Sequence, residues 1–254
     1  MRHSLKEVKK RAFKERECWW LALAIRPIAT RLVYLLHGYE FITPNRLTMV
    51  SLLVAIPGIV FFFRAADGYI FIVLGVIFFN LFYVFDCMDG GLARVRGNVT
   101  KLGTILDSAV GGVVLISYMA TLTTGGYNLS GSDDYLFAGI LWFGLVALSY
   151  IVEYSAERLG INKNTIVEFI ESEEALTTTA GEPVATSPIA RFTSFMAKRR
   201  LLPYPTDIEL FVIVFGIAPL IRQILIGIYI AAGFYLIRLI IKLLVVLRRL
   251  DKGE

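Results

Sequence analysis

The stretch VFDCMDGGLARVRGNVTKLGTILD, residues 84–107, ends one apolar run and begins the next. Asp86 and Asp89 are three residues apart, so on a helix they lie on one face. Asp107 lies one helical turn after Gly103, at the start of the next apolar run. If each apolar run forms a helix and the two helices form a hairpin, the end of the first run lies beside the start of the second. We therefore expect the three carboxyl groups to lie close to one another.

The two runs belong to a longer series of apolar segments. The chain has 254 residues and is 56% hydrophobic, which is too apolar for an ordinary soluble domain. A helix needs about 20 apolar residues to cross a bilayer core. Six segments have about this length: 47–64, 69–88, 103–123, 135–157, 207–222 and 224–246. The sequence therefore predicts an all-α integral membrane protein with six transmembrane helices.

The residues before the first span have a different character. Residues 17–38 mix tryptophan and aliphatic side chains with Arg26, Pro27 and Arg31. Because charges near a bilayer centre are costly, this pattern favours an amphipathic helix in the membrane interface, and a misjudged first span is the alternative. We divide the chain into an N-terminal arm with this helix and a transmembrane domain that includes a cytosolic loop: 1–42, 43–254 and, for the loop, 159–206.

Lys and Arg are distributed unevenly along the chain. Of 26 such residues, 24 lie near the termini or in the loops after spans two and four, and only Arg64 and Arg222 lie on the other side. Cytoplasmic loops are rich in Lys and Arg, so both termini and the 84–107 stretch are predicted to face the cytosol. Attraction to anionic membrane lipids accounts for the net charge of +5 without a nucleic-acid partner.

Three neighbouring carboxylates in a poor dielectric repel one another unless a cation or protons neutralise them. Ligands that are all oxygen suit Mg²⁺ or Mn²⁺. Asp86, Asp89 and Asp107 are therefore predicted metal ligands, and Gly90 and Gly91 would let a phosphate approach the backbone. The alternative is a structural ion network in which the aspartates pair with nearby basic residues: Arg94, Arg96 or Lys101.

The spacing of these residues resembles the motif of the class I CDP-alcohol phosphotransferases (CDP-alcohol phosphatidyltransferases). The family pattern is Asp-x2-Asp-Gly-x2-Ala-Arg-x8-Gly-x3-Asp-x3-Asp. This chain matches every fixed position except the last, which is Gly111, through the following residues: Asp86, Asp89, Gly90, Ala93, Arg94, Gly103 and Asp107. The segment TPNRLT, residues 43–48, is similar to the one that opens the first span in the family.

The resemblance implies an enzyme that transfers a phosphoryl-alcohol group from a CDP-alcohol, such as CDP-diacylglycerol, to a hydroxyl acceptor and releases CMP, in phospholipid biosynthesis. It implies two metal ions on the three aspartates and a homodimer in a bacterial or archaeal membrane. The residues that would border the CDP moiety are Asn45, Thr48, Gly90, Ala93, Arg94, Thr100 and Gly103. For Asn45 and Thr48, a helix N-cap is the alternative.

Gly111 departs from the family pattern. The family has an aspartate there, which is assigned the removal of a proton from the acceptor hydroxyl, and glycine cannot accept a proton. Three explanations stay open. In the first, Gly111 is an introduced change that traps a complex. In the second, the chain is a natural family member that binds a CDP-lipid without turning it over. In the third, it is an active enzyme that uses another base or a more acidic acceptor. A cation transporter lined by the aspartates is a further alternative.

Glu153, in the fourth span, is the other candidate base, and pairing with Arg158 is its structural alternative. Family members that use phosphorylated polyols tend to have Lys or Arg in this region. The local sequence SYIVEY, residues 149–154, therefore disfavours an anionic acceptor. Asp207 and Glu209, before the fifth span, are interpreted as a solvated helix start.

Overall fold

The computed structural model describes residues 4–13, 17–158, 195–196, 198–199, 201–202 and 205–251. Most of the predicted 159–206 loop lies outside these ranges. Helices make up nearly all of the described part. In chain order they are α1 (Leu5–Arg11), η1 (Leu21–Ile25), α2 (Arg26–Leu36), α3 (Pro44–Phe63), η2 (Ala65–Asp67), α4 (Tyr69–Arg96), α5 (Lys101–Ser130), α6 (Asp134–Arg158), α9 (Asp207–Val212), η3 (Ile213–Ile217), α10 (Ala218–Leu220) and α11 (Ile224–Asp251).

Five described helices are long and apolar enough to cross a membrane: α3, α4, α5, α6 and the Ile224–Leu247 part of α11. They coincide with five of the six predicted spans, which confirms a helical membrane protein. α5 continues to Ser130, beyond the predicted end of the third span at residue 123. Gly131, with φ of 69°, ends α5, and its N–H donates to the Tyr127 carbonyl.

The predicted span at 207–222 is a chain of short helices, α9, η3 and α10, which ends at Leu220. At about 1.5 Å per residue it is shorter than a bilayer core of about 30 Å. A π-helical turn, η3, interrupts its hydrogen-bond pattern, and Arg222, with φ of 58°, follows its end. The count of six spans therefore stays a prediction.

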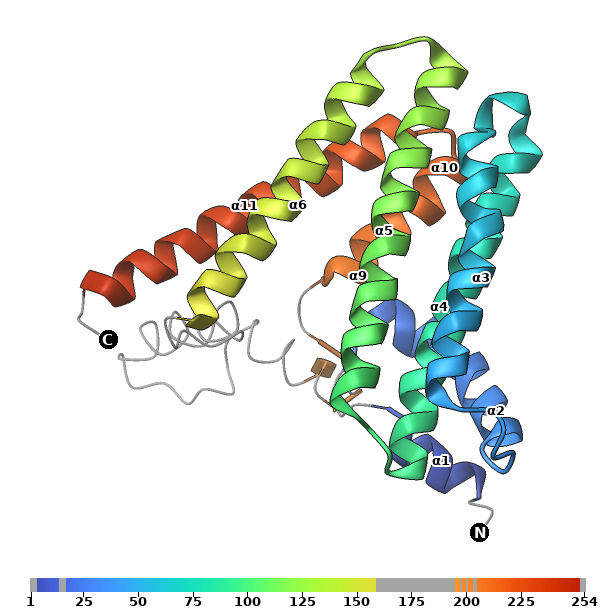
Figure 1. Cartoon of the computed structure of the whole chain (residues 1–254). Helices are drawn as coiled ribbons and strands as arrows, with labels where there is room; N and C mark the ends of the chain where they lie inside the picture. The colour runs from blue at the N-terminus through green and yellow to red at the C-terminus, as the bar shows by residue number, and fades with distance from the viewer. Residues whose placement is uncertain are drawn as a thin grey trace.

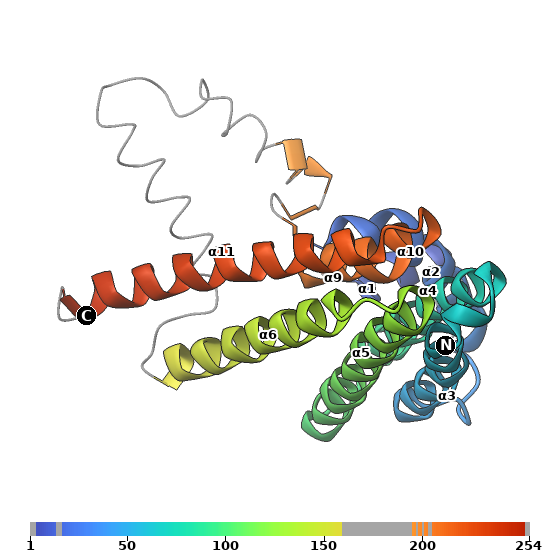
Figure 2. The same ribbon diagram turned by 90° about the horizontal axis from the view of Figure 1, so that it is seen from above.

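The long helices form two groups (Figure 1). α3, α4 and α5 pack together, and α1 and α2 lie against α4. α6 and α11 pack against each other and lean away from the first group, as the view from above also shows (Figure 2). The short α9–α10 segment lies between the two groups, with contacts to both α4 and α11. The start of α3, the end of α4 and the start of α5 lie at the same end of the molecule as α1 and α2.

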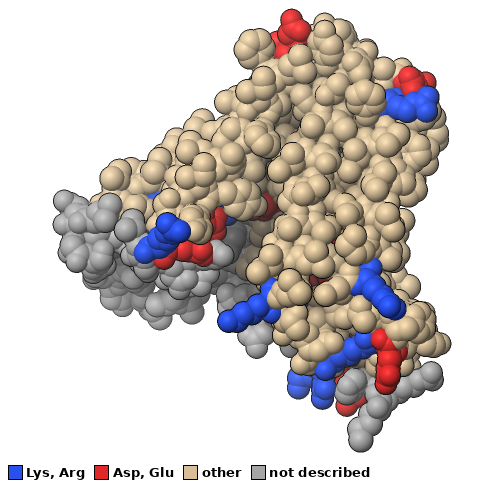
Figure 3. All heavy atoms as spheres, viewed as in Figure 1, with Lys and Arg blue, Asp and Glu red and all other residues tan. Residues whose placement is uncertain are grey.

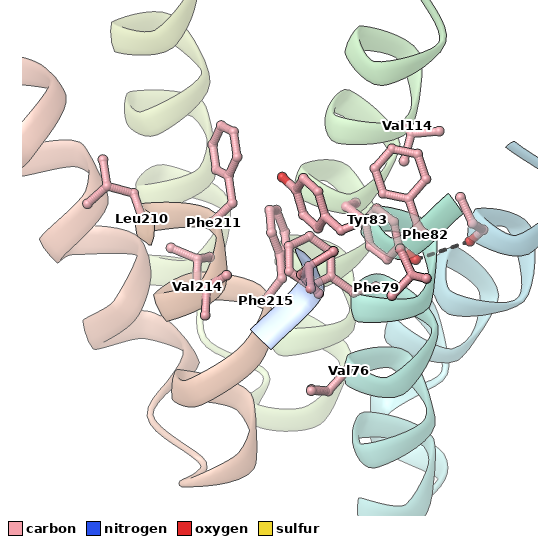
Figure 4. Close-up of a cluster of buried hydrophobic side chains, with 14 of the residues drawn as sticks. Val76, Phe79, Phe82, Tyr83, Val114, Leu210, Phe211, Val214 and Phe215 are labelled. Carbon is pink, nitrogen blue, oxygen red and sulfur yellow. Dashed lines mark hydrogen bonds between the residues drawn. The ribbon is translucent and has the colours of Figure 1, made fainter. Parts of the chain in front are cut away.

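An aromatic cluster joins the two groups around Phe215 of η3, which is 0% exposed. Figure 4 shows side chains of α4 and of the short segment pointing toward one another. Ring centroids 5.0 to 6.3 Å from that of Phe215 belong to Phe62, Phe79, Tyr118, Trp142 and Phe211. In a lipid solvent, close packing of this kind is a main source of helix association.

Two glycines allow α3 to approach α5 closely. A Cβ on Gly125 would overlap the Phe62 carbonyl oxygen, and one on Gly58 would overlap the Tyr118 hydroxyl. That hydroxyl donates to the Ala55 carbonyl at 3.3 Å. Small residues at helix interfaces allow such close approach in membrane proteins. Gly58 and Gly125 therefore let α3 and α5 pack directly against each other.

Residues 21–36 are helical, as η1 and α2. One side packs inward through Ile25, Ala29 and Val33, whereas Leu23 and Leu35 are exposed. The placement of this helix in a membrane interface stays a prediction.

Phe215→Ala is expected to lower the free energy of unfolding by about 3–5 kcal/mol, because it leaves a cavity among five aromatic rings. The measurement is denaturant unfolding of the detergent-solubilised chain. Phe137→Ala is the matched control, since Phe137 is 73% exposed on α6. Equal losses in the two variants would contradict the central role of the cluster.

Cys18 and Cys87 are both free cysteines. Burial raises the pKa of the Cys18 thiol to about 12. Only the thiolate reacts with maleimide, so in a Cys87→Ala background we expect very slow labelling at pH 8. The rate should rise about tenfold per pH unit up to this pKa, as long as the fold persists. Fast labelling of the folded chain at pH 8 would contradict this assignment.

Candidate functional site

A pocket of about 380 Å³ lies where α3 and α5 begin and α4 ends. All seven residues predicted to border a nucleotide line it, together with two of the three predicted metal ligands. The full lining is Thr43, Pro44, Asn45, Thr48, Asp89, Gly90, Ala93, Arg94, Asn98, Val99, Thr100, Gly103, Thr104 and Asp107.

Two helix N-termini face this pocket. Thr43 caps α3 by accepting the Arg46 N–H at 3.3 Å, and Thr100 caps α5 by accepting the Gly103 N–H at 3.0 Å. The N-terminus of a helix carries a partial positive charge and unpaired N–H groups, so it favours anions. The pocket is therefore suited to a phosphate or diphosphate.

Asp89 is the most buried acidic group in the lining, at 3% exposed. Its carboxylate accepts the Thr48 hydroxyl at 2.5 Å and the backbone N–H of Gly90. Thr48 therefore contacts the motif and is not the N-cap of α3, which is Thr43. The Asn45 side chain lies across the pocket, with its Oδ1 near Gly103.

The other two aspartates lie together. The carboxyl groups of Asp86 and Asp107 are within hydrogen-bonding reach of each other, and Asp107 but not Asp86 lines the pocket. Among the described residues, no three acidic, histidine or cysteine side chains are arranged as a metal-binding group. The structure thus pairs Asp86 with Asp107 and Asp89 with Thr48, and metal binding stays a prediction.

Arg94 and Arg96, at the end of α4, have different partners. Arg96 donates to the carbonyls of His37, Tyr39 and Ile42 at 2.6 to 3.2 Å, which holds the turn between α2 and α3. Arg94 donates through Nε to the Ala12 carbonyl at 2.5 Å. The alternative of an ion network between Arg96 and the aspartates is therefore wrong, because backbone carbonyls use this guanidinium.

The motif glycines also differ from one another. Gly90 lines the pocket, where a Cβ would lie 3.2 Å from Nη1 of Arg94. Gly91 is on the other face of α4, where a Cβ would meet Ala12 and Val33 at 3.5 to 3.7 Å. The prediction that Gly91 admits a phosphate was wrong, because α1 and α2 pack there. Gly111 does not line the pocket, and a Cβ there would meet no atom within 4 Å.

The sequence analysis gave pairing of Glu153 with Arg158 as a structural alternative, but Glu153 has other partners. Its carboxylate accepts from Lys242 Nζ at 2.6 Å and lies 3.6 Å from Arg238 Nη2, both on α11. Arg158 instead donates to the Tyr154 hydroxyl at 2.7 Å. Basic groups therefore do lie beside this part of α6, and the prediction from local sequence missed them because they come from a distant helix.

Asp207 and Glu209 begin α9, but they are half-buried rather than solvated. Asp207 pairs with Arg238. Glu209 forms a capping box with Thr206 and also accepts the backbone N–H of Trp19. These acids therefore tie α9 to α11 and to the segment before η1.

The sequence analysis missed five lining residues: Thr43, Pro44, Asn98, Val99 and Thr104. All lie within two residues of ones that it assigned to the site, and the Thr-Pro pair before an apolar run is a recognisable helix-start signal. Basic side chains gather at the lower end of the molecule, beside α1, α2 and the α4–α5 turn, whereas the upper end shows few (Figure 3). The pocket lies at this basic end.

The chain is similar in sequence to known proteins. Two relatives, each named "Bifunctional IPC transferase and DIPP synthase", come from Aquifex aeolicus and Thermococcus kodakarensis and are 31% and 32% identical over 132 and 137 residues. The matches cover 50% and 52% of this chain but only 28% of each relative. The sequence profile of the CDP-alcohol phosphatidyltransferases matches residues 41–235, a range that includes the whole pocket. The chain belongs to the CDP-alcohol phosphatidyltransferase family.

Proposed function

We propose that this chain transfers a phosphoryl-alcohol group from a CDP-alcohol, such as CDP-diacylglycerol, to a hydroxyl acceptor and releases CMP. The observation that carries the proposal is the pocket, which gathers the seven predicted nucleotide residues with Asp89 and Asp107. Membership of the family supports the same reaction class.

The charges around the pocket suit the diphosphate of such a donor. The Arg94 guanidinium lies beside Gly90, and the N-termini of α3 and α5 present partial positive charge. These groups bind and orient the diphosphate, while Asn45 and Thr100 border the nucleotide. Because the fixed positive groups already point into the pocket, they stabilise the negative charge of the departing CMP.

Asp86, Asp89 and Asp107 would hold Mg²⁺ or Mn²⁺. Their oxygen-only donor set fits these ions, and the contact between the Asp86 and Asp107 carboxyl groups needs a cation or a proton between them. When bound, two ions supply charge stabilisation at the attacked phosphorus and at the leaving group. On metal binding, the Asp89 carboxylate would give up its hydrogen bond from the Thr48 hydroxyl and contact the ion instead.

The proposed setting is a bacterial or archaeal cell membrane, with the basic end of the molecule in the cytosol. There the α9–α10 segment would count as the fifth of six spans, and residues 17–38 would lie in the interface. The product would be a membrane phospholipid, and the enzyme would be a homodimer.

A second candidate is a CDP-lipid-binding protein without turnover. The observation that favours it is Gly111, which places no base where the family has aspartate. The pocket would bind the donor equally well in this case.

Asp89→Ala is expected to lower Mg²⁺-dependent CMP release from CDP-diacylglycerol by roughly 10²–10³-fold, since it removes a proposed metal ligand. The measurement uses a panel of acceptor alcohols, with and without a chelator. Asp133→Ala is the matched control, because Asp133 is exposed in the α5–α6 turn. Unchanged release after chelation, or equal rates in both variants, would count against a metal-dependent transferase.

Gly111→Asp is expected to raise CMP release by about 10²–10⁴-fold, which is the usual contribution of a positioned base. A new side chain there meets open space, so the fold should persist. Gly112→Asp is the control, because a Cβ at Gly112 also meets open space. Near-zero release by the unsubstituted chain and by Gly111→Asp, with CDP binding retained in both, would favour the non-catalytic binder.

A further inference from the structure

The N-terminal arm, α1 and the two residues after it, packs beneath the nucleotide pocket. Val8 and Ala12 are 0% exposed, and α1 contacts both α2 and α4. On α4 the contact includes Gly91, where a Cβ would lie 3.6 Å from the Ala12 Cβ. The arm therefore covers the side of the DGGLAR segment opposite the pocket.

One hydrogen bond connects this arm to the pocket. The Ala12 carbonyl accepts Nε–H of Arg94 at 2.5 Å. The guanidinium is planar and rigid, so a hydrogen-bond partner at Nε also fixes the direction in which Nη1 and Nη2 point. Nη1 and Nη2 then lie next to Gly90, within the pocket lining.

Other contacts hold the arm in place. A capping box between Ser4 and Glu7 begins α1. At its other end, the Arg26 guanidinium of α2 lies over the Phe13 ring at 4.5 Å and within 3.6 Å of the Glu17 carboxylate. The carbonyl that receives Arg94 thus belongs to a segment fixed on both sides.

We propose that the N-terminal arm is a positioning element of the nucleotide site, in which the docked Ala12 carbonyl aims Arg94 at the diphosphate of the bound CDP-alcohol. The inference rests on the proposed function. It assigns a role in donor binding to residues 5–13, which lie outside the range 41–235 that matches the family. If the arm were not docked, the Arg94 guanidinium would keep its charge but would no longer be held pointing at the diphosphate. The affinity for the CDP-alcohol would therefore depend on docking of the arm.

The test is a double-mutant cycle on CDP affinity, measured by calorimetry with Mg²⁺ on the full chain in nanodiscs. Ala12→Leu pushes the arm from Gly91 and should weaken CDP binding roughly tenfold, as expected for loss of a charge-assisted hydrogen bond. In an Arg94→Ala background the same substitution should change the affinity less than twofold, because the positioned group is gone.

Two further variants serve as controls. Ala12→Gly keeps the carbonyl and should bind CDP as the unsubstituted chain does. Lys10→Leu adds the same side chain to an exposed position of α1 and should also have no effect. Equal losses of affinity from Ala12→Leu in both backgrounds would overturn the inference, since they would show a general structural effect.

A second measurement avoids substitutions in the arm. Coupling is reciprocal, so CDP should slow hydrogen exchange of residues 5–13 in the unsubstituted chain but not in Arg94→Ala. Exchange unaffected by saturating CDP would overturn the positioning role. If the unsubstituted chain does not bind CDP, the proposed function and this inference both fail. If it binds CDP but the double-mutant cycle shows no coupling between Ala12 and Arg94, this inference alone fails.

Discussion

The burial of Asp89 is the constraint on which the site depends. A carboxylate that is 3% exposed must be compensated largely by the protein around it, because little water contacts it. The fold supplies the Thr48 hydroxyl, the Gly90 N–H and the positive ends of α3 and α5. The same positive groups suit a diphosphate, so the elements that make Asp89 tolerable also make the pocket receptive to a nucleotide.

The face of α4 opposite this pocket is used for packing. Gly91 packs against Ala12 and Val33, and Arg94 donates to the Ala12 carbonyl. Arg96 holds the α2–α3 turn through carbonyls, which places Thr43 and the start of α3 at the pocket. One short helical stretch therefore organises both the site and the N-terminal arm that supports it.

A second group of charges lies between α6, α9 and α11. Glu153, Asp207, Arg238 and Lys242 balance one another, as ionisable groups in partly buried positions must. Glu153 is bonded to Lys242 and does not line the pocket, which makes it a weak candidate for the missing base. This group instead fixes the ends of the two helices that lean away from α3, α4 and α5.

The sequence by itself determined the membrane class, the positions of five long helices and most of the residues that line the pocket. Apolar run length and motif spacing are local properties, so they can be read without a fold. Only the tertiary structure decided that Gly91 packs against α1, that Asp86 faces Asp107, that residues 207–220 form a broken helix, and that Glu153 pairs with Lys242. The last two residues are 89 positions apart. Contacts of this kind depend on how distant helices pack, which no local pattern of side chains specifies.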